Sequence, residues 1–537
     1  MNSFTHQAHP YPVNRNATYA NNGMVATSQP LAAQAGLDIL KKGGNAVDAA
    51  IATAACLTVV EPTSNGIGGD AFALVWINDE LHGLNASGKS PKSISLDEVK
   101  NAGYDKVPQY GWLPVTVPGA PGAWAELSRR FGKLPLTDVM EPAINYAEEG
   151  FPISPTLGKY WKKAYDTFSR ELTGSVFSNW FDTFAPKGRA PRVGEIWSSK
   201  DHADTLRSIA ETNAESFYRG ELAEKMDSFA GKTGGYLAAG DLADYKPEWV
   251  KPIKVNYRGY DVWEIPPNGQ GIIALQALNI LGGFQFGEKD TVNTYHKQFE
   301  AMKLAFSDGY EHVTEEKDMR YTADEILSDE YGDLRRSEIS ETALRPKAGE
   351  PASSGTVYLA AADNDGNMVS FIQSNYKGFG SGLVVPGTGI ALQNRGCEFS
   401  LDANRVNALR GGKRTYHTII PGFLTKDNNP IGPFGVMGGY MQPQGHVQVV
   451  MNMIDFHLNP QAALDAPRWQ WIKDKKVDVE NRFPHHIAQG LAEKGHDIQI
   501  QIEPNSFGRG QIILRDPETG VLIGGTESRT DGAIASW

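Results

Sequence analysis

Cysteine is nearly absent from this 537-residue chain, which contains only Cys56 and Cys397. Two cysteines are too few for a disulfide framework, and they fit a reducing compartment. The chain also lacks a long apolar run: its longest, residues 49–60, includes two threonines and is too short to span a bilayer. The N-terminal residues contain no apolar segment typical of a signal peptide. We therefore predict a cytoplasmic protein without a membrane partner.

Positive charge is not in excess. Lysine and arginine number 51 against 63 aspartates and glutamates, and the formal net charge is -12. This balance argues against a nucleic-acid partner. Hydrophobic residues make up 40% of the chain and charged residues 21%, as in ordinary globular proteins. The length allows either several domains or one large layered domain.

Several well-known site motifs are missing as well. There is no G-x-S-x-G nucleophile elbow, and no histidine pair is spaced to bind a metal from one helix. The DNDGN segment, residues 363–367, lacks acidic ligands that a calcium loop needs and is typical of a hairpin turn. In NGIGGD, residues 65–70, the glycines precede a strand, whereas a dinucleotide-binding loop opens a helix. We expect neither a metal nor a cofactor.

The patterns that are present predict layers of helix and sheet. Residues 28–43 have the spacing of an amphipathic helix with Ser28 as N-cap, and residues 45–62 form a helix that is apolar on nearly all sides and therefore buried. From Thr356 the pattern becomes strand-rich, and residues 356–374 predict a β-hairpin. Buried helices beside hairpins predict an α+β protein in which helices cover antiparallel sheets.

One short stretch, Gly355-Thr356, could supply a nucleophile. It follows RPKAGEPASS, residues 345–354, whose composition is typical of an exposed, cleavable connection. If the chain were cut there, the threonine hydroxyl would be a nucleophile, and the new α-amine, with a pKa of about 7.7–8.0, would be its base. Glycine at position 355 would let the hydroxyl approach the preceding carbonyl. Taken alone, these residues favour a simpler interpretation, a β-branched residue that opens a strand.

The wider sequence favours the interpretation of Thr356 as a nucleophile, because it resembles the gamma-glutamyltranspeptidase family of N-terminal-nucleophile hydrolases. The likeness follows the family's order over nearly the whole chain. It includes GMVATSQPLAAQAGLDILKKGGNAVDAAIATAACLTVVEPTSNGIGGDAF near the start, VPGAPGAWAEL and IPPNGQGI in the middle, TVYLAAADNDGNMVSF, KRTYHTIIPGF and VMGGY further on, and ESRTDGA near the end.

This resemblance implies a four-layer αββα sandwich made as one precursor. The precursor would cut itself between Gly355 and Thr356 into a large subunit, residues 1–355, and a small subunit, residues 356–537, which stay interleaved as one domain. The family's nucleophile falls on Thr356, its hydroxyl partner on Ser374, and its oxyanion-binding glycines on Gly438 and Gly439. Whether this heterodimer forms a homo-oligomer is left open.

The positions that hold substrate in the family differ here. The arginine that binds the glutamyl α-carboxylate is replaced by Ser87, with Lys89 close by. Lys89, Arg395 and His417 suit an anionic acyl end, whereas a cation at position 395 would repel an α-ammonium group. The other matching positions are Tyr376 and Glu398 near the α-amino group and Thr418 beside His417.

Three functions therefore remain. The resemblance implies hydrolysis or transfer of γ-glutamyl groups from small molecules such as glutathione through an acyl-enzyme. The second possibility is an acylase for monoamides of dicarboxylic acids, such as glutaryl side chains. The third is an uncleaved binding or structural protein, which the presence of both Gly355-Thr356 and Gly438-Gly439 argues against.

Overall fold

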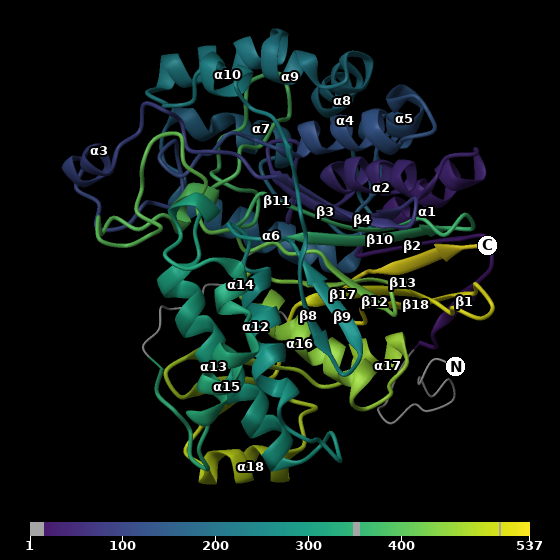
Figure 1. Ribbon diagram of the computed structural model, residues 1–537. Coiled ribbons are helices and arrows are strands. Elements are labelled where there is room, and N and C mark those ends of the chain that lie inside the picture. The colour runs from purple at the N-terminus through teal and green to yellow at the C-terminus, as the bar shows by residue number, and fades with distance from the viewer. Residues whose placement is uncertain (1–14, 347–354, 504–505) are drawn as a thin grey trace.

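Two seven-stranded sheets lie face to face between two layers of helices (Figure 1). This computed structural model describes residues 15–346, 355–503 and 506–537, so most of the predicted cleavable connection lies outside the described residues. In spatial order, the first sheet consists of β19 (Ala533–Ser536), β2 (Gly23–Thr27), β10 (Val357–Asp363), β11 (Met368–Ser374), β3 (Asp70–Ile77), β4 (Glu80–Ala86) and β7 (Glu248–Val250). The second consists of β1 (Thr18–Ala20), β18 (Leu522–Thr526), β17 (Arg509–Arg515), β13 (Asn429–Met437), β12 (Gly422–Lys426), β9 (Tyr260–Glu264) and β8 (Ile253–Tyr257).

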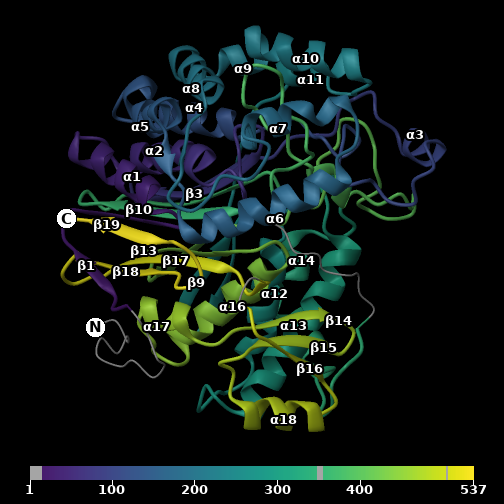
Figure 2. The same ribbon diagram turned by 180° about the vertical axis from the view of Figure 1, so that it is seen from behind.

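Helices cover the outer face of each sheet. Over the first sheet lie α1 (Pro30–Lys41), α2 (Ala46–Val60), α4 (Ala120–Phe131), α5 (Leu136–Glu149) and α8 (Lys200–Thr212), with α9 (Glu215–Arg219) and α10 (Glu221–Thr233) beyond them. Against the second sheet lie α12 (Gly271–Gly282), α16 (Met441–Ile454) and α17 (Pro460–Asp465), and α13 (Val292–His312) and α15 (Asp329–Ser337) pack on α12. In the rear view (Figure 2), a small sheet of β14 (Trp469–Lys473), β15 (Lys476–Glu480) and β16 (Asp497–Gln501) lies beside α13 and next to α18 (His485–Glu493).

The remaining elements are short or lie at the margins. They are α3 (Leu96–Asn101), α6 (Pro155–Glu171), α7 (Ser178–Phe184), α11 (Ala239–Ala243), α14 (Ala323–Ile326), β5 (Phe151–Pro152), β6 (Ile196–Trp197) and 3₁₀ turns at Ser175–Phe177, Glu316–Asp318 and Arg395–Glu398. No helix in the described ranges is both long enough and apolar enough to cross a membrane.

The central strand β10 is buried on both faces. Its side chains alternate between the helical layer, which Val357 and Leu359 contact, and the space between the two sheets, which Tyr358 and Ala360 fill. The β10–β11 hairpin is inserted between β2 and β3, so strands from before and after residue 355 share one sheet. The predicted hairpin and the predicted buried helix at residues 45–62 are both confirmed, since every residue of α2 is buried.

The predicted helix start at Ser28 is wrong by one residue. The side chain of Gln29 caps α1 by accepting hydrogen bonds from the backbone N–H groups of Leu31 and Ala32. The Ser28 hydroxyl instead donates to the buried carboxylate of Glu61. Serine is a good N-cap, but here a buried acceptor from another element binds its hydroxyl.

Candidate active site

Thr356, the predicted nucleophile, is fully buried immediately before β10. Its Oγ1 lies 2.7 Å from the carbonyl oxygen of Gly355 and 3.2 Å from the Oγ of Ser374. The Ser374 hydroxyl also donates to the Gly355 carbonyl, at 2.7 Å, and accepts a hydrogen bond from the backbone N–H of Tyr376. The two hydroxyl groups and the Gly355 carbonyl therefore form one compact group.

Gly438 and Gly439 connect the end of β13 to the start of α16. Their φ angles are +144° and +61°, in the region that side chains on Cβ disfavour. A Cβ at Gly438 would lie 3.1 Å from the Cα of Gly508, so the loop is also tightly packed. Its position at a helix N-terminus suits the stabilisation of negative charge.

Arg395 is a buried cation, with 1% of its surface exposed. Its Nη1 donates to the Thr418 hydroxyl at 2.7 Å, and its guanidinium carbon lies 4.0 Å from the ring centroid of Tyr376. Nε and Nη2 are buried and have no hydrogen-bond partner among the described residues. These two nitrogens form one edge of the guanidinium group, the edge that binds a carboxylate with two parallel hydrogen bonds. Burial lowers the pKa of Arg395.

Glu398 lies close to Arg395 but is engaged by tyrosines. The hydroxyls of Tyr376 and Tyr440 each donate to one of its carboxylate oxygens. Tyr376 has a φ of +75°, which is uncommon for a residue with a side chain and typical of functional sites. Burial, followed by the charge of Glu398, raises the pKa of both tyrosines well above the usual value, so their hydroxyls remain donors at neutral pH.

His417 lies against a second buried carboxyl, that of Asp70. Its Nε2 lies 3.0 Å from Asp70, whose other oxygen accepts hydrogen bonds from Gln393 and the backbone of Gly88. Burial raises the pKa of Asp70 to about 7 and lowers that of His417 well below its usual value. A neutral imidazole that donates to Asp70 is consistent with both directions. Asp70 is also the cross-strand partner of Ser374.

The predicted site residues do not all meet at one point. Ser87 is buried and donates to Asn85 at 2.7 Å, and Asn268 donates to Ser87 at 3.3 Å. Lys89 lines a separate cavity of about 530 Å³ together with Glu248 and Arg414. One network of direct contacts contains Thr356, Ser374, Tyr376, Arg395, Glu398 and Thr418.

Three further residues of this site were not predicted from the sequence. Tyr440 binds Glu398, Asp70 binds His417, and Gln270 donates to the backbone carbonyls of Thr418 and Gly439. Each lies within a stretch that carries the family resemblance: Asp70 ends NGIGGD, Gln270 lies in IPPNGQGI and Tyr440 ends VMGGY. A polar side chain next to a glycine within these stretches was the available signal.

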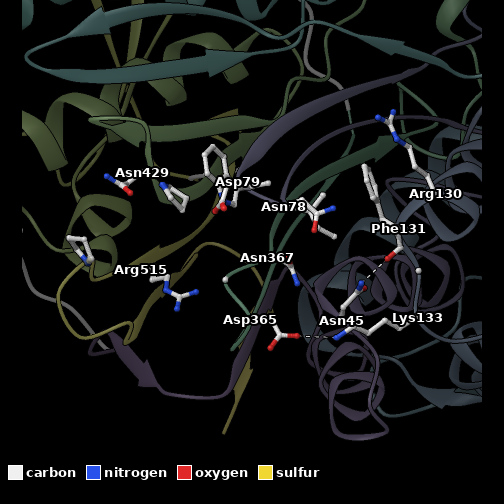
Figure 3. Close-up of a pocket in the computed structure, with 16 residues that line it drawn as sticks. Asn45, Asn78, Asp79, Arg130, Phe131, Lys133, Asp365, Asn367, Asn429 and Arg515 are labelled. Atoms are coloured by element: carbon white, nitrogen blue, oxygen red, sulfur yellow. Dashed lines mark hydrogen bonds and ion pairs between the residues drawn. The ribbon is translucent and has the colours of Figure 1, made fainter.

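A cavity of about 670 Å³ lies at the opposite end of the β10–β11 hairpin from Thr356 (Figure 3). At its wall Lys133 forms an ion pair of 3.0 Å with Asp365. The neighbouring Asp363 accepts hydrogen bonds from Asn367 and from the backbone of Ala46. Protein donors thus bind both carboxylates of the DNDGN segment, which forms the predicted hairpin turn.

One group among the described residues has the composition of a metal site. His296 and Glu300 on α13 and His496 place their ligand atoms within 4.8 Å of one another. The Lys303 Nζ lies 2.7 Å from Glu300 and 3.3 Å from His496. His296 and His496 are hydrogen-bonded to each other at 2.8 Å. The lysine ammonium therefore supplies the positive charge that a metal ion would supply.

These features define the class of protein. A family model for gamma-glutamyltranspeptidase matches residues 32–537, and the chain belongs to this family of enzymes, which has the N-terminal-nucleophile hydrolase fold. The predicted family and the αββα fold class are confirmed.

The names of individual relatives state several different activities. The chain is 37% identical to a glutathione hydrolase-like YwrD proenzyme from Bacillus subtilis, over 95% of this chain and 97% of the relative. It is 32% identical to an oxamate amidohydrolase proenzyme from Klebsiella pneumoniae, over 96% and 99%. Among solved structures, a cephalosporin acylase from Bacillus halodurans is 68% identical over 99% of both chains, with a TM-score of 0.96.

Proposed function

We propose that the protein is a self-processing amidohydrolase with Thr356 as its nucleophile. In the precursor, Thr356 Oγ attacks the carbonyl carbon of Gly355. The C–N bond breaks and the hydroxyl proton passes to the nitrogen, which leaves an ester. Water then cleaves the ester to give the Gly355 carboxylate and a free Thr356 amine. The 2.7 Å distance between Thr356 Oγ1 and the Gly355 carbonyl oxygen supports this step.

After cleavage the same hydroxyl would attack the substrate. The Thr356 amine takes the hydroxyl proton and passes it to the leaving nitrogen as the acyl ester forms. The N–H groups of Gly438 and Gly439 would bind the oxyanion. Water, deprotonated by the amine, then releases the acid and restores the hydroxyl, and an acceptor amine in place of water would give transfer.

The large subunit, residues 1–355, and the small subunit, residues 356–537, would remain one folded unit after cleavage. Insertion of β10 and β11 between β2 and β3 supports this, because separation would break the backbone hydrogen bonds of both neighbouring strands. These contacts lie within one chain, so they neither require nor oppose a homo-oligomer of this unit.

The substrate we propose is the monoamide of a short dicarboxylic acid, as in glutaryl amides. The observation that carries this choice is the buried edge of Arg395, Nε and Nη2, which has no hydrogen-bond partner in the part of the chain that the structure describes. A buried cation with unsatisfied donors is costly unless an anion binds it, and a carboxylate fits this edge. The relatives named as a cephalosporin acylase and an oxamate amidohydrolase support the choice, since oxamate is the monoamide of oxalic acid.

γ-Glutamyl compounds such as glutathione are the second candidate, favoured by the glutathione hydrolase-like relative. Their α-carboxylate would fit the same edge of Arg395. Their α-ammonium group would need Glu398, and both oxygens of Glu398 already accept hydrogen bonds from tyrosines. The cation of Arg395 would repel this ammonium group, and the acyl group that we propose therefore lacks it.

Two measurements test this proposal. Denaturing gels with N-terminal sequencing should give a small fragment that begins TVYLA in the wild type and none in Thr356→Ala. Thr388→Ala is the control for this test, because Thr388 is also buried but is remote in sequence from the cut, and it should be processed.

Substrate preference is measured by the release of p-nitroaniline from glutaryl, γ-glutamyl and valeryl p-nitroanilides. We expect kcat/KM to be highest for the glutaryl compound, lower by about tenfold or more for the γ-glutamyl compound, and lower again by a similar factor for the valeryl compound. Turnover by Thr356→Ala, or fastest turnover of the valeryl compound, would refute it.

A further inference from the structure

Gln270 is a buried side chain that joins two parts of the site. It immediately precedes α12 and has none of its surface exposed. Its Nε2 donates to the carbonyl oxygens of Thr418, at 2.6 Å, and Gly439, at 2.8 Å, and its Oε1 accepts from the Tyr416 hydroxyl at 2.8 Å. Both amide hydrogens and the amide oxygen are thus used in directed contacts.

The contact with Gly439 bears on catalysis because it adds a side-chain restraint to the oxyanion loop, whose glycine carbonyls otherwise accept backbone hydrogen bonds from Met441 and Gln442. Two adjacent glycines give the backbone more conformational freedom than any other pair of residues. A hydrogen bond to the Gly439 carbonyl restricts rotation of this loop and hence the direction of its N–H groups. Such donors are effective only when they already point at the position where negative charge develops.

The contact with Thr418 links the same amide to the residue that binds Arg395. The Thr418 hydroxyl accepts from Arg395 Nη1, and its carbonyl accepts from Gln270. One side-chain amide therefore joins the oxyanion loop to Thr418, the residue that holds the acyl-binding arginine. An acyl group of fixed length must span these two points for its carbonyl to reach the loop.

We propose that Gln270 is the positioning residue that holds the Gly438-Gly439 loop in register with the Arg395 acyl-binding edge. This inference rests on the proposed function, and it assigns Gln270 a role in turnover of substrate rather than in self-cleavage. The Gly355 carbonyl receives its side-chain hydrogen bonds from Thr356 and Ser374, not from this loop. Cleavage should therefore proceed without Gln270.

The test uses Gln270→Met, which keeps the volume and removes the amide, and Gln270→Glu, which keeps an acceptor for Tyr416 and removes both donors. Gln276→Met is the matched control, because Gln276 is a buried glutamine within α12 that donates to Asp308 on α13 and not to the loop. For each, we would measure the fraction cleaved, the melting temperature, kcat and KM for glutaryl anilide, and the Ki of free glutarate.

In both Gln270 variants we expect complete cleavage, a fall in kcat of about 100-fold and a Ki for glutarate within about fivefold of wild type. Gln276→Met should lower the melting temperature at least as much and leave kcat within about threefold. A wild-type kcat in Gln270→Met, or an equal loss of kcat in Gln276→Met, would overturn the inference. Failure of the proposed function would be recognised separately, by turnover in Thr356→Ala.

Discussion

The hydroxyl of Ser374 donates to the carbonyl oxygen of Gly355 at 2.7 Å while it lies 3.2 Å from the hydroxyl of Thr356. Attack on that carbonyl would place negative charge on the oxygen that Ser374 contacts. One such donor is worth about 10²–10³ in rate. We therefore expect Ser374→Ala to slow self-cleavage by about 100-fold, measured as the disappearance of the full-length band on gels after synthesis is stopped.

Ser370→Ala is the control for this prediction. Ser370 lies on the same strand, is equally buried and exchanges a hydrogen bond with Tyr358 instead of with residue 355. It should cleave at the wild-type rate, and Ser374→Thr should restore most of the rate because it retains the hydroxyl. Rapid cleavage of Ser374→Ala would show that this hydroxyl does not stabilise the transition state.

Replacement of Arg395 by methionine tests how the acyl group is recognised. The variant removes Nε and Nη2, which no described residue binds, together with the buried charge, while it keeps much of the side-chain volume. Because each hydrogen bond between charged groups contributes about 1.5–3 kcal/mol, kcat/KM for glutaryl anilide should fall at least about 100-fold. The rate with uncharged valeryl anilide should stay constant or rise. Steady-state kinetics with both compounds measures the change in preference.

Arg414→Met provides the comparison for this experiment. Arg414 is also buried, but it binds the backbone of Ser87 and the carboxylate of Glu248. Its replacement should affect both anilides by a similar factor. If the two arginine variants changed the ratio of glutaryl to valeryl turnover equally, recognition of the acyl carboxylate by Arg395 would be contradicted.

Local patterns in the sequence predicted those parts of the fold that depend on local physics. The all-apolar helix at residues 45–62 could only be buried, and the DNDG turn between two apolar runs could only close a hairpin. The Ser28 cap failed because the hydroxyl contacts Glu61, 33 residues away in the chain. The residues around Ser28 do not indicate that a distant carboxylate would bind its hydroxyl.

The sequence likewise predicted some parts of the site but not others. Motif positions predict roles for Thr356, Ser374 and the paired glycines, which the family resemblance aligns, and these roles stay predictions. The orientation of Arg395 could not be predicted, because it depends on Thr418 and on the ring of Tyr376. Asp70 and Gln270 bind residues more than 140 positions away in the chain, so only the folded chain shows their partners.

The buried ion pair between Lys303 and Glu300 should matter for stability, because neither side chain has exposed surface. Lys303→Met would leave the Glu300 carboxylate buried without its cation, at a cost of about 3–5 kcal/mol. The double variant Lys303→Met/Glu300→Gln should recover much of this loss, since it also removes the charge. Melting temperatures of wild type and the two variants, at one pH and salt concentration, measure the difference. Equal destabilisation in both variants would contradict a role for the uncompensated charge.

His202 should make the protein less stable in acid. It is buried on α8 against Phe184 and Trp197, and burial lowers its pKa from 6.5 to about 4. Between these values the unfolded chain binds a proton that the folded chain does not, so stability falls as the pH decreases from 6.5 toward 4. At about 1.4 kcal/mol per pKa unit, the loss from pH 7 to pH 4.5 is about 2 kcal/mol.

His202→Asn tests this contribution, because asparagine retains a hydrogen-bonding group near Ser199 but cannot be protonated. Its stability should be lower than that of wild type at pH 7, owing to lost packing, and the difference should narrow by about 2 kcal/mol at pH 4.5. Chemical denaturation at both pH values measures this change. His457→Asn, at an exposed position, is the control and should show the same dependence on pH as wild type. A constant difference between His202→Asn and wild type would contradict a lowered pKa of His202 in the folded protein.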